Sequence, residues 1–144
     1  MKKQEQLKKM QLKTLGILEH NEDGAWVVSF HPDFAPEVHR FSAAVRRDIY
    51  SLVGLLGKLG PQLGRPQVDT LKGSKHSNMK ELRFSADGGA WRVAFAFDVK
   101  RRAILLVGGD KSGVSKDRFY RNLIKIADRR FEQHQWAVAV EKEK

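Results

Sequence analysis

The sequence has 144 residues, the size of one ordinary domain, and its 41% hydrophobic and 31% charged residues exclude a disordered chain. It contains no cysteine, which excludes a disulfide scaffold, a thiolate metal site and a cysteine nucleophile. No apolar segment follows the basic start and no run of eighteen apolar residues occurs, so we expect a soluble, cytoplasmic protein. The 27 basic and 17 acidic side chains give a net charge of +10, which favours an anionic partner.

The positive charge is concentrated in two segments. Residues 65–83 hold five basic and two acidic side chains, and residues 111–131 hold seven and two. Eight of the ten net charges therefore lie within 40 residues. Two explanations remain open at this point: a solvated basic surface that keeps the protein soluble, or a shared surface that binds an anion.

The chain is predicted to begin with a helical extension over residues 1–24, followed by a domain over 25–135 and a tail over 136–144. The extension carries apolar residues at helical spacing, namely Leu7, Met10, Leu12, Leu15 and Leu18. Its net charge is too small for an autonomous RNA clamp, so we expect it to dock on the domain or on a partner. The domain starts with a predicted strand over 25–30, which Pro32 ends.

A long amphipathic helix is predicted after Pro36. Its stripe consists of Val38, Phe41, Val45, Ile49, Leu52, Leu56 and Leu59. Gly54 and the glycines after it weaken this helix and are expected to split it into a helical hairpin near residue 54.

Four strands and a final helix follow in the prediction. The strands span 68–71, 79–84, 90–97 and 103–107, spacings that suit an antiparallel meander. The helix is capped by Ser115 and carries the stripe Phe119, Leu123, Ile126, Ala127 and Phe131. The segment 136–140 is compatible with a continuation of this helix or with a short strand.

Several kinds of catalytic site find no support in the sequence. There is no glycine-rich phosphate loop, because Gly54, Gly57 and Gly60 lie in a helical pattern. The five histidines are scattered and lack the spacing of a metal site. No pair of carboxylates is singled out for a hydrolase.

Basic side chains on the predicted sheet are the strongest candidates for function. Strand alternation places Arg92 on the small-residue face with Ala94 and Ala96, which predicts an exposed concave surface. Lys111 follows the last strand, directly after a glycine pair expected to let the backbone approach a ligand. The alternative for each cation is a surface ion pair with a nearby carboxylate such as Glu81.

An ordered set of short motifs resembles the phage-related, HigB-like branch of the RelE/ParE toxin superfamily. The motifs run between residues 26 and 134: Leu63-Gly64-Arg65-Pro66, Leu71-Lys72-Gly73, Lys80-Glu81-Leu82-Arg83, Trp91-Arg92-Val93, Phe95-Ala96-Phe97-Asp98, Leu105-Leu106-Val107-Gly108-Gly109-Asp110-Lys111 and Phe119-Tyr120. The resemblance implies an α+β fold in which a small, mainly antiparallel sheet carries helices on one side. It also implies the toxin of a type II toxin–antitoxin pair, many of which cleave mRNA on the ribosome without a metal or cofactor.

The resemblance assigns roles residue by residue. Arg92 is similar to a phosphate-clamping arginine and Lys111 to a catalytic cation, while Lys80 and Arg83 match basic positions of the preceding strand. Tyr120 matches an aromatic that stacks on a base or shares proton transfer, although it is equally suited to packing the helix on the sheet. The residues expected to bind RNA are Lys72, Lys75, His76, Lys116 and Arg118.

This chemistry suits the composition, because RNA supplies its own nucleophile, the 2′-hydroxyl, and lysine and arginine can supply a base, a charge stabiliser and a proton donor. The expected partners are the ribosome, mRNA and a cognate antitoxin of the helix-turn-helix type; no metal and no cofactor are expected. The alternatives are a non-enzymatic DNA gyrase inhibitor of the ParE kind and a phage-encoded nucleic-acid-binding module.

Overall fold

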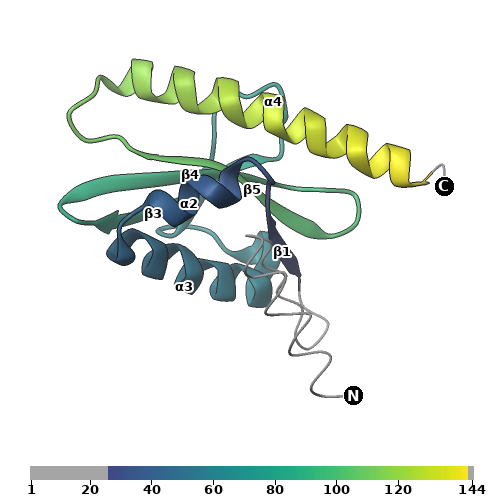
Figure 1. Ribbon diagram of the computed structural model, residues 1–144, viewed down its shortest axis with the longest axis horizontal. Helices are drawn as coiled ribbons and strands as arrows, with labels where there is room; N and C mark the ends of the chain where they lie inside the picture. Colours follow the sequence, from purple (N-terminus) through teal and green to yellow (C-terminus); the bar gives the residue numbers. More distant parts are fainter. Residues whose placement is uncertain (1–25, 143–144) are drawn as a thin grey trace.

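The computed structural model describes residues 26–142 (Figure 1). The helix predicted within residues 1–24, and the expectation that it docks, lie outside the described residues. The helices and strands are β1 (Val27–Phe30), α2 (Phe34–Arg40), α3 (Ala43–Leu59), the 3-10 helix η1 (Gly60–Gln62), β2 (Val68–Thr70), β3 (Met79–Ala86), β4 (Gly89–Phe97), β5 (Arg102–Asp110) and α4 (Lys116–Lys142).

The five strands form one sheet in the order β1-β5-β4-β3-β2. Strands β2 to β5 pair antiparallel in chain order, as short turns between successive strands require, whereas β1 pairs parallel with β5. The predicted α+β class and the mainly antiparallel meander are confirmed. The pairing of β1 with β5 was not predicted, because a parallel contact between strands so distant in sequence leaves no local signal.

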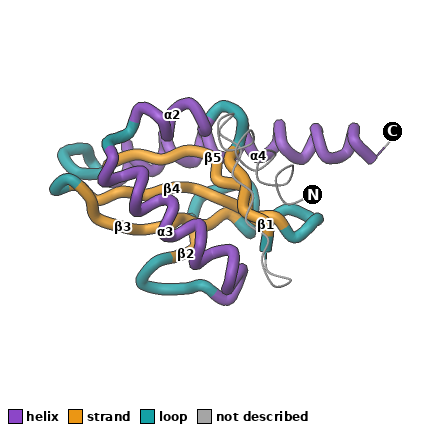
Figure 2. Tube along the Cα trace, turned by 60° about the horizontal axis from the view of Figure 1, so that its bottom comes forward, coloured by secondary structure: helices purple, strands orange, loops and turns teal. Residues whose placement is uncertain are grey.

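Helices α2 and α3 cover one face of the sheet. The α3 stripe of Val45, Ile49 and Leu56 belongs to the same buried cluster as Phe95 and Leu105 of the sheet. Figure 2 shows α3 running across the strands. This layer is the larger apolar core of the described chain.

The predicted helical hairpin near Gly54 is wrong, because α3 runs without a break to Leu59. One glycine costs a helix only about 1 kcal/mol, which packing of the α3 stripe outweighs. The break falls earlier, between α2 and α3, where Phe41 is extended and Ser42 starts the new helix. The Ser42 hydroxyl accepts a hydrogen bond from the Val45 amide at 3.2 Å, an N-cap that satisfies one otherwise free helix donor.

The structure differs from the prediction in the placement of α4, which covers the second face of the sheet (Figure 1). The α4 side chains Leu123, Ala127 and Phe131 pack against Ala94 and Ile104. Helix α4 has an apolar side that is stable only when it is buried. The small side chains of β4, Ala94 and Ala96, let the helix approach the sheet closely. The sheet is therefore covered on both faces.

Two polar contacts attach α4 to the rest of the fold. The Arg130 guanidinium, 7% exposed, donates to both carboxylate oxygens of Glu37 in α2 at 2.8 and 2.7 Å and to the Leu106 carbonyl at 2.7 Å. Further along the helix, His134 Nε2 lies 2.8 Å from Asp98 Oδ2. These contacts fix both the position and the rotation of α4 on the sheet.

The segment 136–140 continues α4, which settles the alternative that the sequence left open in favour of helix. Val138 is buried, whereas Trp136 is 71% exposed. None of the helices within residues 26–142 is long and apolar enough to cross a membrane.

Candidate active site

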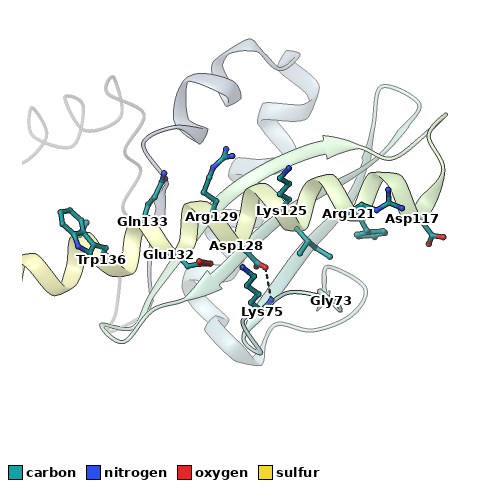
Figure 3. A pocket seen from close by; sticks show the side chains of 13 residues that line it. Gly73, Lys75, Asp117, Arg121, Lys125, Asp128, Arg129, Glu132, Gln133 and Trp136 are labelled. Atoms are coloured by element: carbon teal, nitrogen blue, oxygen red, sulfur yellow. Dashed lines mark hydrogen bonds between the residues drawn. The ribbon is translucent and has the colours of Figure 1, made fainter.

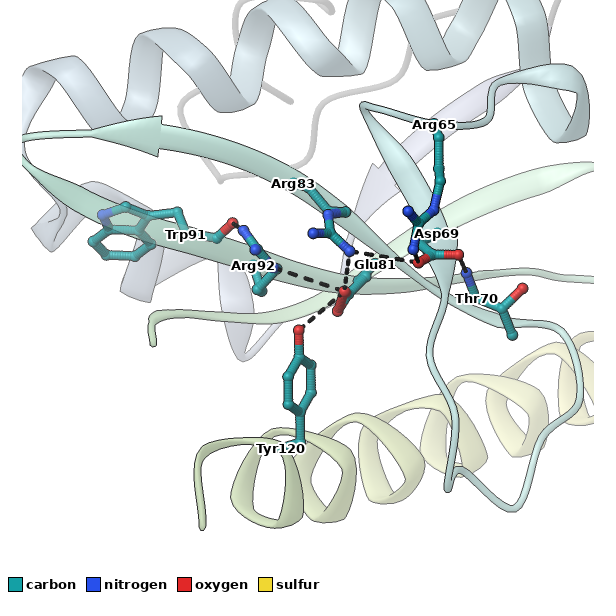
Figure 4. A network of polar contacts seen from close by, with 8 residues as sticks. All are labelled: Arg65, Asp69, Thr70, Glu81, Arg83, Trp91, Arg92 and Tyr120. Carbon is teal, nitrogen blue, oxygen red and sulfur yellow. Dashed lines mark hydrogen bonds and ion pairs between the residues drawn. The ribbon is translucent and has the colours of Figure 1, made fainter. Parts of the chain in front are cut away.

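A cluster of cations lies on the α4 side of the sheet, where β3, β4 and the first turns of α4 meet (Figure 4). The antiparallel register pairs Arg83 directly with Arg92 and Glu81 with Ala94, so Glu81, Arg83 and Arg92 share one face. Like charges directly opposite each other in a sheet are unfavourable. A fold keeps such a pair where a neighbouring anion compensates it or where function requires it.

Glu81 is the anion between the two arginines. Its Oε1 atom lies 3.5 Å from Arg83 Nη1 and 3.7 Å from Arg92 Nε. The carboxylate is 3% exposed, and burial raises the pKa of Glu81 although Tyr120 and both arginines oppose the shift. The sequence indicated Glu81 only as an ion-pair partner, because nothing in a strand pattern tells which of several carboxylates becomes the hub.

Tyr120 joins this cluster from α4. Its hydroxyl donates to Glu81 Oε1 at 3.0 Å, and its ring packs against the apolar cluster beneath α4 (Figure 4). Burial raises the pKa of Tyr120, so the phenol keeps its proton at neutral pH. Tyr120 thus occupies a packing position and a position in the polar cluster at once.

The predicted exposed concave surface around Arg92 is wrong, because Arg92 is only 7% exposed. α4 covers the small-residue face of β4 that the prediction left open to solvent. The Arg92 Nη1 atom donates to the carbonyl of Trp91 at 2.8 Å, and Nε has no hydrogen-bond partner among the described residues. Arg83 is more accessible, with 31% of its side chain exposed.

Lys111 lies at the edge of the same cluster. It follows β5, where its backbone amide donates to the Ala90 carbonyl at 2.9 Å. The positive charge of Arg92 lowers the pKa of Lys111, and partial burial and Arg83 lower it further. The charges of Arg92 and Arg83 therefore favour the neutral form of the Lys111 amine. Glu81 is surrounded by four residues, Arg83, Arg92, Lys111 and Tyr120, which together form the cation cluster.

The glycines before Lys111 serve packing and not the approach of a ligand. A Cβ atom on Gly108 would lie 3.0 Å from the Val93 side chain, and one on Gly109 would lie 3.3 Å from the Phe119 ring. The expectation that this pair opens the backbone to a ligand is therefore wrong. The close neighbours are the adjacent strand and the first turn of α4.

A second carboxylate extends the cluster toward β2. Asp69 Oδ2 accepts from Arg65 Nη2 at 2.6 Å and from Arg83 Nη1 at 3.4 Å (Figure 4). The hydrogen bond from Arg65 is the main cause that lowers the pKa of Asp69. Arg83 is thus held by two carboxylates, Glu81 and Asp69.

Lys80 is not part of the cation cluster. It pairs with Phe95 across β3 and β4, and the residues of this register face α3. Strand alternation places consecutive residues on opposite faces, so Lys80 and Glu81 cannot both point toward α4.

The predicted RNA-binding residues lie in two places. Lys72 and Lys75 are exposed on the loop between β2 and β3, while Lys116 and Arg118 are exposed at the start of α4. His76 instead attaches the loop to α4: its ring meets Phe131 edge-on at 5.1 Å, and Nε2 lies 3.3 Å from Glu132.

Asp128 of α4 holds the same loop, a role that was not predicted from the sequence. This carboxylate is 7% exposed and accepts from the Ser74 hydroxyl and from the Lys75 amide at 3.0 Å. The loop is therefore tied to α4 by two acidic side chains. Within residues 26–142, no group of three or more histidine and carboxylate side chains comes together in a way that could hold a metal ion.

Comparison with known proteins identifies the family. The model of the phage-derived protein Gp49-like family matches residues 36–132. The chain belongs to the Gp49-like family. The predicted resemblance to the HigB-like branch of the RelE/ParE superfamily is thereby confirmed.

Two curated proteins of Mycobacterium tuberculosis are similar to this Gp49-like chain. "Putative toxin HigB3" is 48% identical over 101 residues, which cover 67% of this chain and 86% of that protein. "Putative toxin HigB2" is 43% identical over 106 residues, which cover 68% of this chain and 52% of that protein. No solved structure shows a significant match.

Proposed function

We propose that the chain is the toxin of a type II toxin–antitoxin pair and that it is an endoribonuclease, which cleaves mRNA on the ribosome. The cation cluster carries this proposal: Arg83, Arg92 and Lys111 converge beside a protonated phenol on one face of the sheet. The names of the two Mycobacterium tuberculosis relatives support the toxin part.

The proposed reaction is the transfer of a phosphate from the 5′-oxygen of one nucleotide to the 2′-oxygen of its neighbour. The 2′-oxygen bonds to phosphorus and gives up its proton, and the bond from phosphorus to the 5′-oxygen breaks. The leaving 5′-oxygen takes up a proton, and a 2′,3′-cyclic phosphate remains. Such a reaction needs a proton acceptor, a donor and positive charge for the extra negative charge on the phosphate.

The cation cluster can supply each of these. Lys111 is the proton acceptor, because the arginines lower its pKa and enlarge its neutral fraction at neutral pH. Tyr120 holds its proton, and it is the donor to the 5′-oxygen once its hydroxyl turns from Glu81 Oε1 toward the substrate. Arg83, the more exposed arginine, contacts the phosphate, and the buried Arg92 adds positive potential from behind.

Glu81 keeps these groups in place without reacting. Its Oε1 atom is occupied by Tyr120 and faces both arginines, and its Oε2 atom is buried without a hydrogen-bond partner among the described residues. The substrate backbone is bound at the rim by Lys72, Lys75, Lys116 and Arg118. The partner is an antitoxin that covers this basic surface.

One experiment in cells separates this proposal from gyrase inhibition. Expression of the chain from a tightly controlled promoter should arrest growth and create new mRNA 5′ ends inside translated regions. DNA breaks that depend on gyrase should stay at the level of the uninduced cells. Both are measured by sequencing RNA ends and gyrase-linked DNA ends from the same culture.

A Lys111→Ala variant expressed at the same level provides the matched control and should produce neither arrest nor new ends. Growth arrest with gyrase-linked breaks and without new RNA ends would replace the ribonuclease proposal with the ParE-like alternative.

A further inference from the structure

An open groove runs along the solvent side of α4, and apart from Tyr120 and Lys75 its lining residues have no role in the reaction proposed above. Its lining on α4 begins at Asp117 in the first turn of the helix, includes Tyr120 in the second turn and ends with Trp136 and Ala137 (Figure 3). At 1.5 Å per residue, the sixteen residues from Tyr120 to Trp136 span about 24 Å. Since the Tyr120 hydroxyl contacts Glu81, one end of the groove opens at the cation cluster.

A row of cations follows this groove. Arg121, Lys125 and Arg129 are exposed and stand four residues apart, so they lie on one side of α4 at intervals of about 6 Å. Lys125 and Arg129 point away from the loop that carries Gly73 and Lys75 (Figure 3). Among residues 26–142, no carboxylate lies within 4.0 Å of any of the three cationic groups.

Two of the three carboxylates in the lining are engaged elsewhere, and the third, Asp117, is exposed at the start of α4 and lies more than 4.0 Å from the three cationic groups. Asp128 accepts hydrogen bonds from Ser74 and the Lys75 amide, and Glu132 faces His76 at 3.3 Å. Both belong to the side of α4 that holds the loop. As far as residues 26–142 are concerned, the row of cations is therefore available to an external anion.

Trp136 lies at the far end of the groove with an exposed indole. It is 71% exposed, and no aromatic ring of the described residues packs against it. An exposed tryptophan beside unpaired cations is the arrangement with which proteins bind single-stranded nucleic acid: cations follow the backbone, and an aromatic ring stacks on a base.

We propose that this face of α4 binds a single-stranded RNA segment, with Arg121, Lys125 and Arg129 on successive phosphates and Trp136 stacked on a base. The inference rests on the ribonuclease function proposed above, because the bound strand leads to the cation cluster. The groove thus extends the substrate site beyond the cleaved nucleotide by about 24 Å, a length that suits roughly four nucleotides.

RNA fits this surface better than an acidic protein does. A docked protein helix needs a continuous apolar stripe, and the apolar lining of α4 is interrupted: Tyr120 and Ile124 at one end are separated from Trp136 and Ala137 at the other by charged residues that include Asp128 and Glu132. The regular spacing of the cations and the link to Tyr120 instead match a chain of evenly spaced phosphates.

The test measures binding of the purified full-length chain to a fluorescently labelled single strand of about twelve nucleotides, with 2′-O-methyl groups throughout. This RNA has no free 2′-hydroxyl, so affinity is measured without cleavage. The triple variant R121Q/K125Q/R129Q should bind at least about tenfold more weakly. Its plot of log affinity against log salt should be shallower by about two, since three phosphate contacts are lost.

The matched control removes three exposed cations from α2 and α3, on the other side of the sheet: R40Q/R47Q/K58Q. The control has the same net charge as the test variant, and its affinity should stay within about twofold of the original. A second readout is tryptophan fluorescence: RNA should quench the emission of the original chain, and Trp136→Phe should remove most of that quenching. Trp136→Ala, which removes the stacking ring, should weaken binding about tenfold.

Equal loss of affinity in both triple variants would show attraction by overall charge only and overturn the proposal. So would unchanged RNA affinity in the α4 variant; if this variant also lost affinity for a glutamate-rich helical peptide, the face would belong to an acidic protein partner. Cleavage of ordinary mRNA with unchanged affinity of the α4 variant would reject this inference and leave the ribonuclease proposal intact. Binding through α4 without any RNA cleavage would support this inference and reject the ribonuclease proposal.

Discussion

Lys111→Met should lower the rate of ribosome-dependent mRNA cleavage by about two to four orders of magnitude, the usual contribution of a general base to an enzymatic reaction. Methionine keeps the length of the side chain and removes only the amine, which lies near Arg92 and Arg83. Because Lys111 is not buried and forms no side-chain hydrogen bond with the described residues, the melting temperature should stay nearly unchanged.

The measurement is a single-turnover cleavage assay with purified ribosomes and a defined mRNA. Lys58→Met, an exposed lysine of α3 remote from the cluster, is the control and should cleave at the original rate. Full activity of the Lys111 variant together with full activity of the control would remove Lys111 from the reaction.

Asp98→Asn should lower the free energy of unfolding at pH 7 by about 2 to 3 kcal/mol. The Asp98 carboxylate, whose side chain is 3% exposed, accepts from Arg102 Nε at 2.8 Å and from two backbone amides, and it also contacts His134 at 2.8 Å. The hydrogen bonds from His134 and Arg102 outweigh burial and lower the pKa of Asp98 from 3.8 to about 2. At 1.36 kcal/mol per pKa unit, this shift gives the expected figure.

The pH dependence has a fixed sign. A carboxylate with a lowered pKa in the folded state stabilises the protein fully above its unfolded pKa of about 4, and this contribution is lost as the pH falls from about 4 to about 2. In urea unfolding, the difference in stability between the original chain and the Asp98 variant should therefore shrink as the pH falls below about 4, to roughly a third of its value at pH 7 when the pH reaches about 2.5. Asp48→Asn, on α3 and without an ion pair among the described residues, should change stability by less than about 0.5 kcal/mol. An Asp98 variant as stable as this control would show that the contact with His134 does not hold α4.

The elements with a local signal were predictable from the sequence. Alternation located β3, β4 and β5, and the stripe around Phe119, Leu123 and Phe131 located α4 together with its Ser115 cap, whose hydroxyl accepts from the Arg118 amide. Non-local contacts were not predictable in the same way. The parallel pairing of β1 with β5 and the covering of the second sheet face by α4 depend on packing between distant segments.

In the candidate site, too, residues within recognisable motifs were predictable, whereas roles that depend on distant partners were not. Motif resemblance found Arg83, Arg92, Lys111 and Tyr120, and the fold brings them together. It also grouped Lys80 with them, although alternation along β3 puts that residue on the opposite face. The carboxylates were missed because their roles depend on partners: Glu81 on facing arginines, and Asp128 on a loop more than fifty residues away.

One altered substrate shows whether the 2′-hydroxyl of RNA is the nucleophile. The chain is incubated with ribosomes and either an ordinary mRNA or the same mRNA with a single 2′-deoxy sugar on the 5′ side of the cut. We expect 2′,3′-cyclic phosphate ends from the ordinary mRNA and no cleavage at the deoxy position. Cleavage of the deoxy substrate at the same bond would show that the 2′-hydroxyl is not the nucleophile.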